Sequence, residues 1–411
     1  MLQYEEALAR VISAVPAPAS ESIALAEADG RFLAQDILSP IDLPPFDNSA
    51  MDGYAVRAVN VASAKLNSPV RLRLVGRVAA GEKFLGDVTS GTCVRLFTGS
   101  PLPNGADAVV MQEDTKADGA APNEVFVLES VKPWENVRFQ GEDIKKTATV
   151  AAKGDAITVG RLALLAATGN VEVAVSRRPT VGILATGSEL KEPGQLLAPG
   201  QIYESNRPAI AALARKAGAI PQVYPLVTDV LEATQIALSN AFKECDMVIT
   251  SGGVSVGEMD FVKRALAELG GELQFWKVTI KPGRPFVFGR LPCSPNRLSS
   301  VDDKLFFGLP GNPVSALVTF LLLVRPAILR WQGASNVALA RHSAVLAEPL
   351  ENPGERRHYM RVRISTDGKC HSAGTQASHI LSSFAVANGL VDIPPRTVLA
   401  AGTTVEVLRW D

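Results

Sequence analysis

The stretch Asp246-Met247-Val248-Ile249-Thr250-Ser251-Gly252-Gly253-Val254-Ser255 decides the fold class of this chain. Residues 246–251 form a short apolar run, which is typical of a strand covered on both faces. Residues 261–269 then have apolar positions at helical spacing. Between them, Gly252 and Gly253 allow the backbone to approach a ligand beside a helix N-terminus. The stretch therefore predicts a strand, a ligand-binding turn and a helix.

The same alternation of strand and helix continues on both sides, over residues 179–330. The predicted strands are residues 181–186, 222–227, 246–251 and 274–280, and the predicted helices are residues 208–217, 231–242 and 261–269. We predict a three-layer α/β/α domain with a mostly parallel sheet. In such sheets ligands bind beyond the carboxyl ends of the strands, where the loops gather.

The rest of the chain predicts three further domains, because 411 residues are too many for one core. Helical patterns at residues 4–15 and 21–29 indicate a helical and extended domain. Short strand-like runs separated by Gly, Pro and Asn indicate a β-rich domain inserted into it, and strand-like runs near the C-terminus indicate a small β-barrel. The predicted multidomain α/β protein has these boundaries: 1–44 plus 141–178 (helical), 45–140 (inserted β-rich), 179–330 (α/β) and 331–411 (β-barrel).

Composition indicates a cytoplasmic protein with a small-molecule ligand. Lys plus Arg (41) and Asp plus Glu (42) nearly cancel, which argues against a nucleic-acid surface. The longest apolar stretch, residues 316–324, is far shorter than the roughly 20 residues that cross a bilayer, so we expect a buried helix and no membrane contact. Met1–Arg10 does not resemble a signal peptide. The four cysteines lie far apart without C-x-x-C, which favours reduced thiols over zinc or disulfides.

The most informative motif for chemistry is Ser251 to Asp260. Ser251, Ser255 and Asp260 offer hydroxyls and a carboxylate beside the paired glycines, which suits a phosphate group. Neither G-x-G-x-x-G nor G-x-x-x-x-G-K-[ST] occurs here, so a Rossmann dinucleotide site and a P-loop are disfavoured. The alternative is a tight turn with a purely structural role.

Cations are predicted to meet at the end of the next strand. Lys277, Thr279 and Lys281 alternate, which places them on one strand face, and Arg284 lies just past its end. Such a group suits an oxyanion or phosphate, and the alternative is ordinary solvated lysines. In residues 308–315, Asn312 is the predicted N-cap of a helix with Pro313 in its first position. The free N–H groups there could bind an anion, or the motif could serve capping alone.

Other segments carry weaker signals, because turn chemistry explains each of them equally well. Glu189, in the loop after the strand at residues 181–186, is a candidate ligand for magnesium or a substrate donor. The remaining segments combine glycine-containing turns, hydroxyls and carboxylates: residues 44–55, 98–103, 141–144 and 375–383. No pair of histidines has the spacing of a zinc hydrolase.

Taken in order, these segments resemble the molybdenum insertases, the molybdopterin molybdenumtransferase family that also includes the C-terminal domain of gephyrin. The resemblance covers about residues 5 to 400. It implies four domains per subunit, an elongated homodimer and an active-site cleft to which both subunits contribute. It also implies a reaction in which adenylylated molybdopterin and molybdate, with Mg²⁺, give the molybdenum cofactor and AMP. The protein partners that it implies are a molybdopterin adenylyltransferase and proteins that mature molybdoenzymes.

The resemblance also assigns roles to residues of this sequence. The catalytic carboxylates would be Asp52, Asp143, Glu189, Asp229 and Asp260, of which Glu189, Asp229 and Asp260 would hold the metal. The substrate or molybdate would contact Thr98, Ser251, Gly252, Gly253, Ser255, Lys277, Lys281, Arg284, Pro310, Pro313 and Ser378. Arg284 stands where relatives have lysine and Ala377 where they have glycine, and we expect an insertion at residues 292–302 to be peripheral. Two alternatives remain, a molybdopterin adenylyltransferase and a non-catalytic scaffold of the gephyrin kind.

Overall fold

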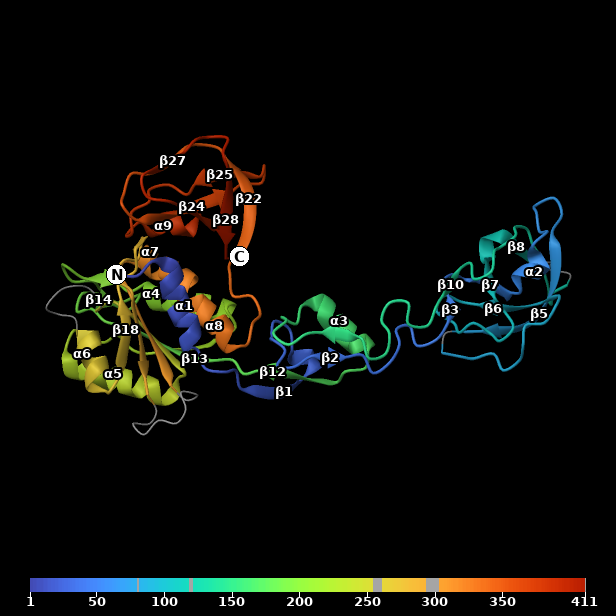
Figure 1. Ribbon diagram of the computed structural model, residues 1–411, viewed down its shortest axis with the longest axis horizontal. Coiled ribbons are helices and arrows are strands. Elements are labelled where there is room, and N and C mark those ends of the chain that lie inside the picture. Colours follow the sequence, from blue (N-terminus) through green and yellow to red (C-terminus); the bar gives the residue numbers. More distant parts are fainter. Residues whose placement is uncertain (80, 118–120, 254–260, 293–302, 411) are drawn as a thin grey trace. The chain divides into compact units, whose positions relative to one another are not determined.

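The computed structural model describes residues 1–79, 81–117, 121–253, 261–292 and 303–410. The chain forms two compact units (Figure 1). Unit 1 comprises Met1–Gln35, Lys153–Ile157 and Val173–Asp411, and unit 2 comprises Asp36–Ala152 and Thr158–Glu172. The finer division into four domains stays a prediction.

Unit 1 is built around a six-stranded sheet. In spatial order its strands are β16 (Ile220–Val223), β13 (Thr180–Ala185), β17 (Met247–Ser251), β21 (Lys304–Leu309), β20 (Val287–Leu291) and β18 (Glu272–Trp276). The first four strands are parallel, and β20 is antiparallel to both of its neighbours. This arrangement confirms the predicted mostly parallel sheet.

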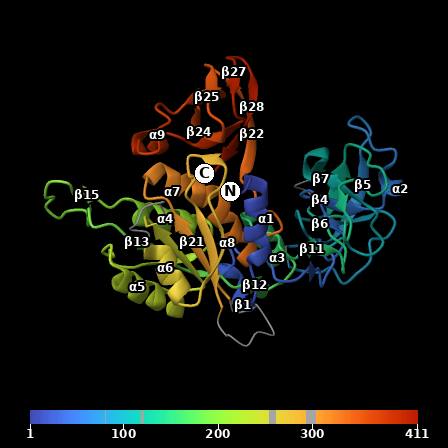
Figure 2. The same ribbon diagram turned by 60° about the vertical axis from the view of Figure 1, so that its left-hand side comes forward.

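Helices cover both faces of this sheet, as the predicted three-layer fold requires. One face packs on α5 (Leu231–Glu244) and α6 (Phe261–Glu268), and the other packs on α4 (Asn206–Lys216) and a long helix made of α7 (Pro313–Thr319), the π-turn η3 (Phe320–Val324) and α8 (Arg325–Trp331). In Figure 2, β21 lies between α6 on one side and α8 on the other.

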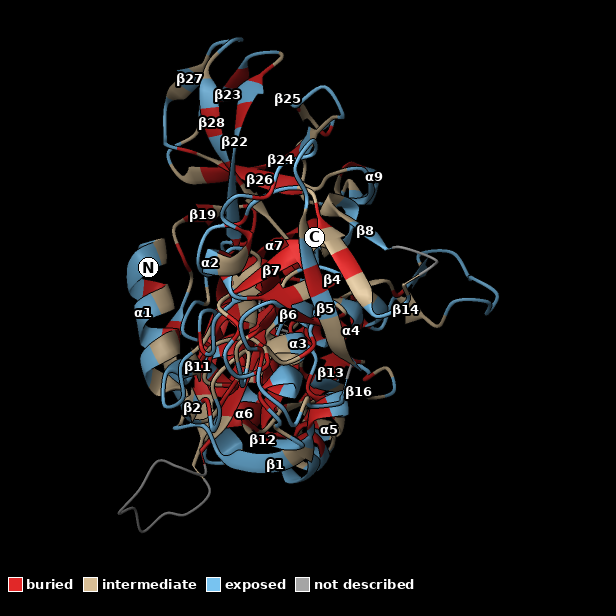
Figure 3. Cartoon of the chain, turned by 90° about the vertical axis from the view of Figure 1, so that its right-hand side faces the viewer, coloured by how far each residue is buried: buried red, intermediate tan, exposed pale blue. Residues whose placement is uncertain are grey.

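The long apolar helix belongs to the core of unit 1. Residues 313–331 are long and apolar enough to cross a membrane, but 89% of the most apolar window is buried inside the protein. Its first part, α7, is buried (red) in Figure 3. The N-terminal helix α1 (Tyr4–Ala14) packs on the same core through Ala7 and Val11. The buried helix predicted at residues 316–324 is confirmed.

The C-terminal part of unit 1 is a closed five-stranded barrel. Its strands follow one another round the ring as β24 (Arg357–Ile364), β25 (Lys369–Ser372), β22 (Ala340–Leu346), β28 (Thr404–Arg409) and β26 (Gly389–Ile393), which pairs again with β24. The short strand β19 (Ile280–Lys281) pairs with β24 in parallel. Minor elements here are β23 (Leu350–Asn352), β27 (Thr397–Leu399) and α9 (Leu381–Ala385). The predicted barrel is confirmed.

Unit 2 contains a mixed six-stranded sheet. In spatial order its strands are β7 (Ala108–Met111), β4 (Gly53–Val56), β6 (Thr92–Leu96), β5 (Val70–Val78), β9 (Glu124–Val127) and β8 (Thr115–Ala117). The other elements are the strands β2 (Ile37–Leu38), β3 (Asn48–Ser49), β10 (Val137–Arg138) and β11 (Thr149–Ala151) and the helices α2 (Ala58–Val61) and α3 (Val159–Ala167). The predicted β-rich insertion is therefore present.

Three local predictions were wrong in part or in full. The strand predicted at residues 222–227 is β16, which the structure places at Ile220–Val223. The helix predicted at residues 21–29 is instead the strand β1 (Ser20–Ala24), which pairs with β12 (Glu172–Ser176), followed by one 3₁₀ turn. The strand predicted at residues 274–280 ends at Trp276, because Lys277 has a φ of 69°, outside the extended region. Lys277, Thr279 and Lys281 therefore do not share the face of one strand.

Candidate functional site

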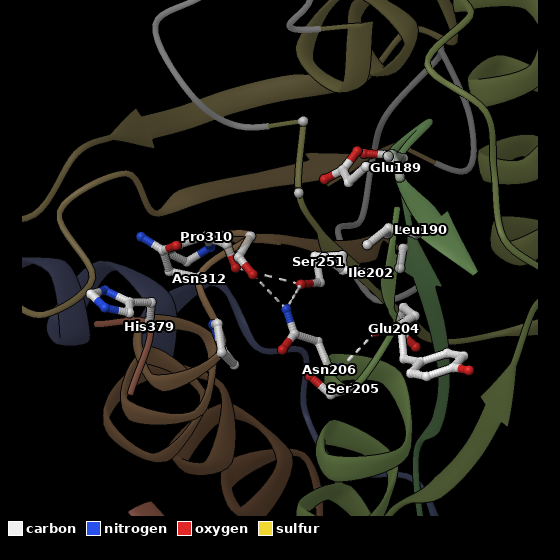
Figure 4. A pocket seen from close by; sticks show the side chains of 18 of the residues that line it. Glu189, Leu190, Ile202, Glu204, Ser205, Asn206, Ser251, Pro310, Asn312 and His379 are labelled. Carbon is white, nitrogen blue, oxygen red and sulfur yellow. Dashed lines mark hydrogen bonds between the residues drawn. The ribbon is translucent and has the colours of Figure 1, made fainter. Parts of the chain in front are cut away.

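Two neighbouring cavities of unit 1 contain most of the predicted site residues that the structure describes there. The acidic cavity, of about 660 Å³, is lined by three carboxylates, Glu189, Glu204 and Asp229, of which Figure 4 labels Glu189 and Glu204. The basic cavity, of about 630 Å³, is lined by Lys281, Arg284 and Arg356. Residues common to both linings are Pro285, Pro310, Asn312 and His379. The two cavities therefore share a wall and differ in charge.

The sheet positions the acidic cavity. Its lining comes from the ends of three strands and the loops that follow them. These residues are Thr186 and Gly187 after β13, Ser251 to Gly253 at the end of β17, and Pro310 to Asn312 after β21. Because the three strands are parallel, their carboxyl ends meet at one edge of the sheet. The prediction that the informative loops gather at that edge is confirmed for Glu189, Ser251, Gly252, Gly253, Pro310 and Pro313.

The turn after β17 requires glycine. Gly252 has a φ of +91°, and a Cβ atom there would lie 2.5 Å from the carbonyl oxygen of Thr186. Gly253 has a φ of +64° and would place a Cβ atom 2.6 Å from the side chain of Val262. The turn thus brings bare backbone to the cavity. The predicted site residues Ser255 and Asp260 lie outside the described residues.

A buried asparagine, which the sequence reading missed, joins two of these loops. The Asn206 Nδ2 donates to Ser251 Oγ at 2.7 Å and to the carbonyl oxygen of Gly311 at 2.8 Å (Figure 4). Because a carbonyl only accepts, this contact fixes the orientation of the amide. Asn206 is 8% exposed and begins α4. The start of that helix was predicted from sequence, but not the contact across 45 residues to Ser251.

Of the three carboxylates that line the acidic cavity, Glu204 is paired with Arg207, and the other two, Glu189 and Asp229, fit Mg²⁺. Glu189 is exposed and Asp229 half-buried, and Asp229 Oδ2 accepts a hydrogen bond from the backbone N–H of Ser188 at 3.2 Å. Mg²⁺ is commonly held by one or two carboxylates together with substrate phosphates and water. Among the described residues no group of three or more His, Cys, Asp or Glu could hold a metal by itself. The site therefore fits a metal ion that takes some of its ligands from the protein and the others from a phosphate-containing substrate.

The basic cavity combines the α/β part with the barrel. Lys281 and Arg284 come from β19 and the loop after it, and Arg356 precedes β24 in the barrel. Arg356 Nη1 donates to the carbonyl oxygen of Ile280 at 3.0 Å, which ties the two parts together. Arg356 was not predicted, because the pairing of β19 with β24 leaves no periodic signal in the sequence. Arg356 is thus the third cation that lines the basic cavity, beside Lys281 and Arg284.

Asn312 contributes to the site in a way that capping does not explain. It precedes α7 with Pro313 in the first position, as predicted, but its side chain makes no capping hydrogen bond. Instead, Asn312 Nδ2 donates to Ser378 Oγ at 3.1 Å, and the Val314 N–H donates to the carbonyl oxygen of Ser378 at 3.2 Å. The predicted site residue Ser378 is thereby held at the basic cavity.

Behind the basic cavity lie two buried basic side chains. Burial lowers the pKa of His358 to about 3, helped by the positive charges of Lys281, Arg361 and Arg356. Burial also lowers the pKa of Arg361 to about 10. Arg361 Nη2 donates to the carbonyl oxygens of Thr375 and Ala377, which fixes the segment that presents Ser378.

The remaining predicted residues lie outside both cavities. The Lys277 ammonium sits 3.6 Å from the ring centroid of Trp276, a cation–π contact, and lines neither cavity. Asp52, Thr98 and Asp143 belong to unit 2. There the backbone N–H and the hydroxyl of Thr98 both donate to Asp52 Oδ1 at 2.8 Å, and these bonds lower the pKa of Asp52. The two predicted site residues Asp52 and Thr98 are therefore hydrogen-bonded to each other, and their role in the reaction stays a prediction.

Comparison with known proteins now gives the family. Residues 2–169 match the MoeA N-terminal region (domain I and II), residues 182–330 a probable molybdopterin binding domain, and residues 343–410 the MoeA C-terminal region (domain IV). A molybdopterin molybdenumtransferase of Haemophilus influenzae is 39% identical over 99% of this chain and 98% of its own. The chain belongs to the molybdopterin molybdenumtransferase family.

Other members of the molybdopterin molybdenumtransferase family match equally broadly. The Bacillus subtilis protein is 35% identical over 99% of this chain and 94% of its own. A crystal structure of the molybdopterin biosynthesis moeA protein from Pyrococcus horikoshii has 32% identity and a TM-score of 0.83, covering 99% of each chain. The predicted identity as a transferase and the predicted multidomain α/β fold are confirmed, and the role of the chain lies in molybdenum cofactor biosynthesis.

Proposed function

We propose that this protein inserts molybdenum into molybdopterin, using adenylylated molybdopterin and molybdate with Mg²⁺ and releasing AMP. One observation carries the proposal: a cavity lined by the carboxylates of Glu189, Glu204 and Asp229 shares a wall with a cavity lined by three cations. A reaction that joins an oxyanion to a phosphate-containing substrate needs both kinds of site next to each other.

The acidic cavity would receive the phosphate linkage of the substrate. Bound there by Glu189 and Asp229, Mg²⁺ would neutralise charge that develops on phosphoryl oxygens when AMP leaves. Ser251 and the bare backbone at Gly252 and Gly253 would contact the substrate beside it. Pro310 would shape the wall between the cavities, and Pro313 the wall of the acidic cavity.

The basic cavity would hold molybdate. The cavity offers the positive charges of Lys281, Arg284 and Arg356 and the hydroxyl of Ser378. All four groups can donate hydrogen bonds to the oxygens of a tetrahedral oxyanion. Arg284 adds a planar fork of N–H groups where a lysine would offer one compact charge. Asn312, which lines both cavities and bonds to Ser378, would keep the oxyanion next to the substrate.

Further parts of the proposal rest on the family resemblance. By that resemblance, Asp52, Thr98, Asp143, Ser255, Asp260 and Lys277 would also take part in the reaction. A homodimer whose subunits both contribute to the cleft, a cytoplasmic location, and contact with a molybdopterin adenylyltransferase or maturation proteins are part of the same proposal.

The decisive experiment mixes purified protein with adenylylated molybdopterin and follows AMP release with and without molybdate, and with and without Mg²⁺. We expect release that needs both ions. An adenylyltransferase would instead make the adenylate from molybdopterin and ATP. A scaffold of the gephyrin kind would do neither, so a folded protein that releases no AMP from the authentic substrate contradicts the proposal.

A further inference from the structure

One side of the acidic cavity carries apolar side chains. The ribbon of β14 (Leu190–Lys191) and β15 (Ile202–Tyr203) lines it with Leu190 and Ile202 (Figure 4). Ile202 is 55% exposed, and Leu190 is half-buried. An aliphatic side chain that borders a cavity and stays exposed offers surface that a ligand can remove from water.

Buried charge holds this ribbon in place. Arg207, which is 3% exposed, donates through Nε to Glu204 at 2.9 Å and through Nη2 to Glu192 at 2.7 Å. Glu192 directly follows β14, and Glu204 directly follows β15, so one guanidinium binds the ends of both strands. The Tyr203 hydroxyl donates to the carbonyl oxygen of Gln195 at 2.8 Å, which fastens the loop between the strands. The apolar surface is therefore preorganised.

The ribbon also links this surface to the carboxylates. Glu189 directly precedes Leu190, and the Ile202 N–H donates to the carbonyl oxygen of Glu189 at 2.9 Å. A Cβ atom at Gly187 would lie 2.8 Å from Glu189 Oε2 and 2.8 Å from Leu190 Cγ, so both side chains fold closely over this glycine. A charged group and an apolar surface thus lie side by side at the start of the ribbon.

We infer that Leu190 and Ile202 form an apolar platform for a flat heterocyclic ring of the substrate. The inference rests on the proposed function and specifies how its acidic cavity recognises the substrate. A ring joined to a phosphate by a short linker would place the phosphate at Glu189 and Asp229 and the ring on Ile202. The substrate has two such rings, the pterin and the adenine, and both offer the flat apolar face that the platform requires.

Equilibrium titration with AMP and, separately, with molybdopterin tests the platform in the wild type and in Ile202→Ala. Ile236→Ala is the matched control, because Ile236 is 56% exposed on α5 and lines neither cavity. Loss of one apolar contact should weaken binding of one of the two ligands about fivefold to tenfold. Weaker AMP binding would assign the platform to adenine, and weaker molybdopterin binding would assign it to the pterin.

The inference is overturned if Ile202→Ala binds both ligands within twofold of Ile236→Ala, or if the wild type binds neither. Thermal melting of both variants checks that each remains folded. Because the titrations need no turnover, they separate this inference from the proposed function. Molybdate-dependent AMP release by a wild type whose platform variant binds normally would leave the function standing and remove the platform.

Discussion

The acidic and the basic cavity share a wall, yet the chain builds them differently. The acidic cavity forms at one edge of a parallel sheet, where loops that follow β13, β17 and β21 meet. The basic cavity requires two folding elements, since Lys281 and Arg284 come from the α/β part and Arg356 and Ser378 from the barrel region. In this protein the edge of one sheet is enough to bring carboxylates and bare backbone together. Bringing three cations together requires the barrel as well, because Arg356 comes from the barrel.

The largest effect should come from the acidic cavity. Glu189→Gln keeps the shape of the side chain but removes the negative charge, so Mg²⁺, which would neutralise the leaving phosphate, loses a charged ligand. We expect the rate of AMP release at saturating substrate to fall about 100-fold, the scale of losing one transition-state contact. The measurement is steady-state AMP release at several Mg²⁺ concentrations.

Glu232→Gln is the control for this variant, because Glu232 is an exposed carboxylate in the first turn of α5 and lines neither cavity. Its rate should match that of the wild type. Equal losses in both variants would show that general charge, rather than the acidic cavity, sets the rate.

A smaller effect is expected in the basic cavity. Arg284→Ala removes one of three cations, so the KM for molybdate should rise about tenfold, as expected for one charge-assisted hydrogen bond. The KM for adenylylated molybdopterin should change less than twofold. Arg363→Ala, which alters an exposed arginine on β24, should change neither value. If both KM values rise together in Arg284→Ala, the two cavities do not divide the substrates between them.

The buried imidazole behind the basic cavity predicts a pH effect on stability. In the folded protein the pKa of His358 is lowered to about 3, whereas an unfolded chain has the ordinary value of about 6.5. Between these values only the unfolded chain binds the proton, so the folded state loses stability as the pH falls. One such group lowers the free energy of unfolding by up to about 1.4 kcal/mol per pH unit.

Denaturant unfolding of wild type and His358→Leu at pH 7.5, 6 and 5 measures this effect. The variant lacks the titrating group, so its stability should fall less steeply with decreasing pH. Parallel stability curves would mean that His358 takes up a proton in the folded protein, and that the cations around it do not raise the local potential.

Much of the fold was readable from the sequence because its signals are local. Apolar runs bounded by glycine predicted β13 and β17, and the Pro313 pattern predicted the start of α7. Lys277 shows the limit of such patterns, since its alternation with Lys281 looked like one strand face until its positive φ broke the strand. Backbone conformation there depends on neighbours that are distant in sequence, such as Phe286, whose carbonyl oxygen accepts the Lys277 N–H.

The site was predictable to a similar degree. Residues in loops directly after strands, such as Glu189 and Ser251, were found because strand ends mark ligand sites in this fold class. Asn206, Arg356 and His358 were missed, because their importance arises from contacts across 45 or more residues or from burial. No spacing rule encodes such contacts.

The smallest predicted effect concerns Asp52, a carboxylate of unit 2 that the proposal adds to the acidic set. The hydrogen bond from the Thr98 N–H lowers the pKa of Asp52 most, and the hydrogen bond from the Thr98 hydroxyl lowers it further. Thr98→Val keeps the first bond and removes the second, so the pKa should rise slightly toward the ordinary aspartate value in a carboxyl NMR titration, while Thr98→Ser should leave it unchanged. At a pH above the ordinary aspartate pKa, these two hydrogen bonds stabilise the folded protein. That stabilisation is lost as the pH falls through the lowered pKa of Asp52. Asp52 stays ionised at pH 7 in both variants, so a large loss of AMP release in Thr98→Val alone would mean that the hydroxyl of Thr98 contacts the substrate directly.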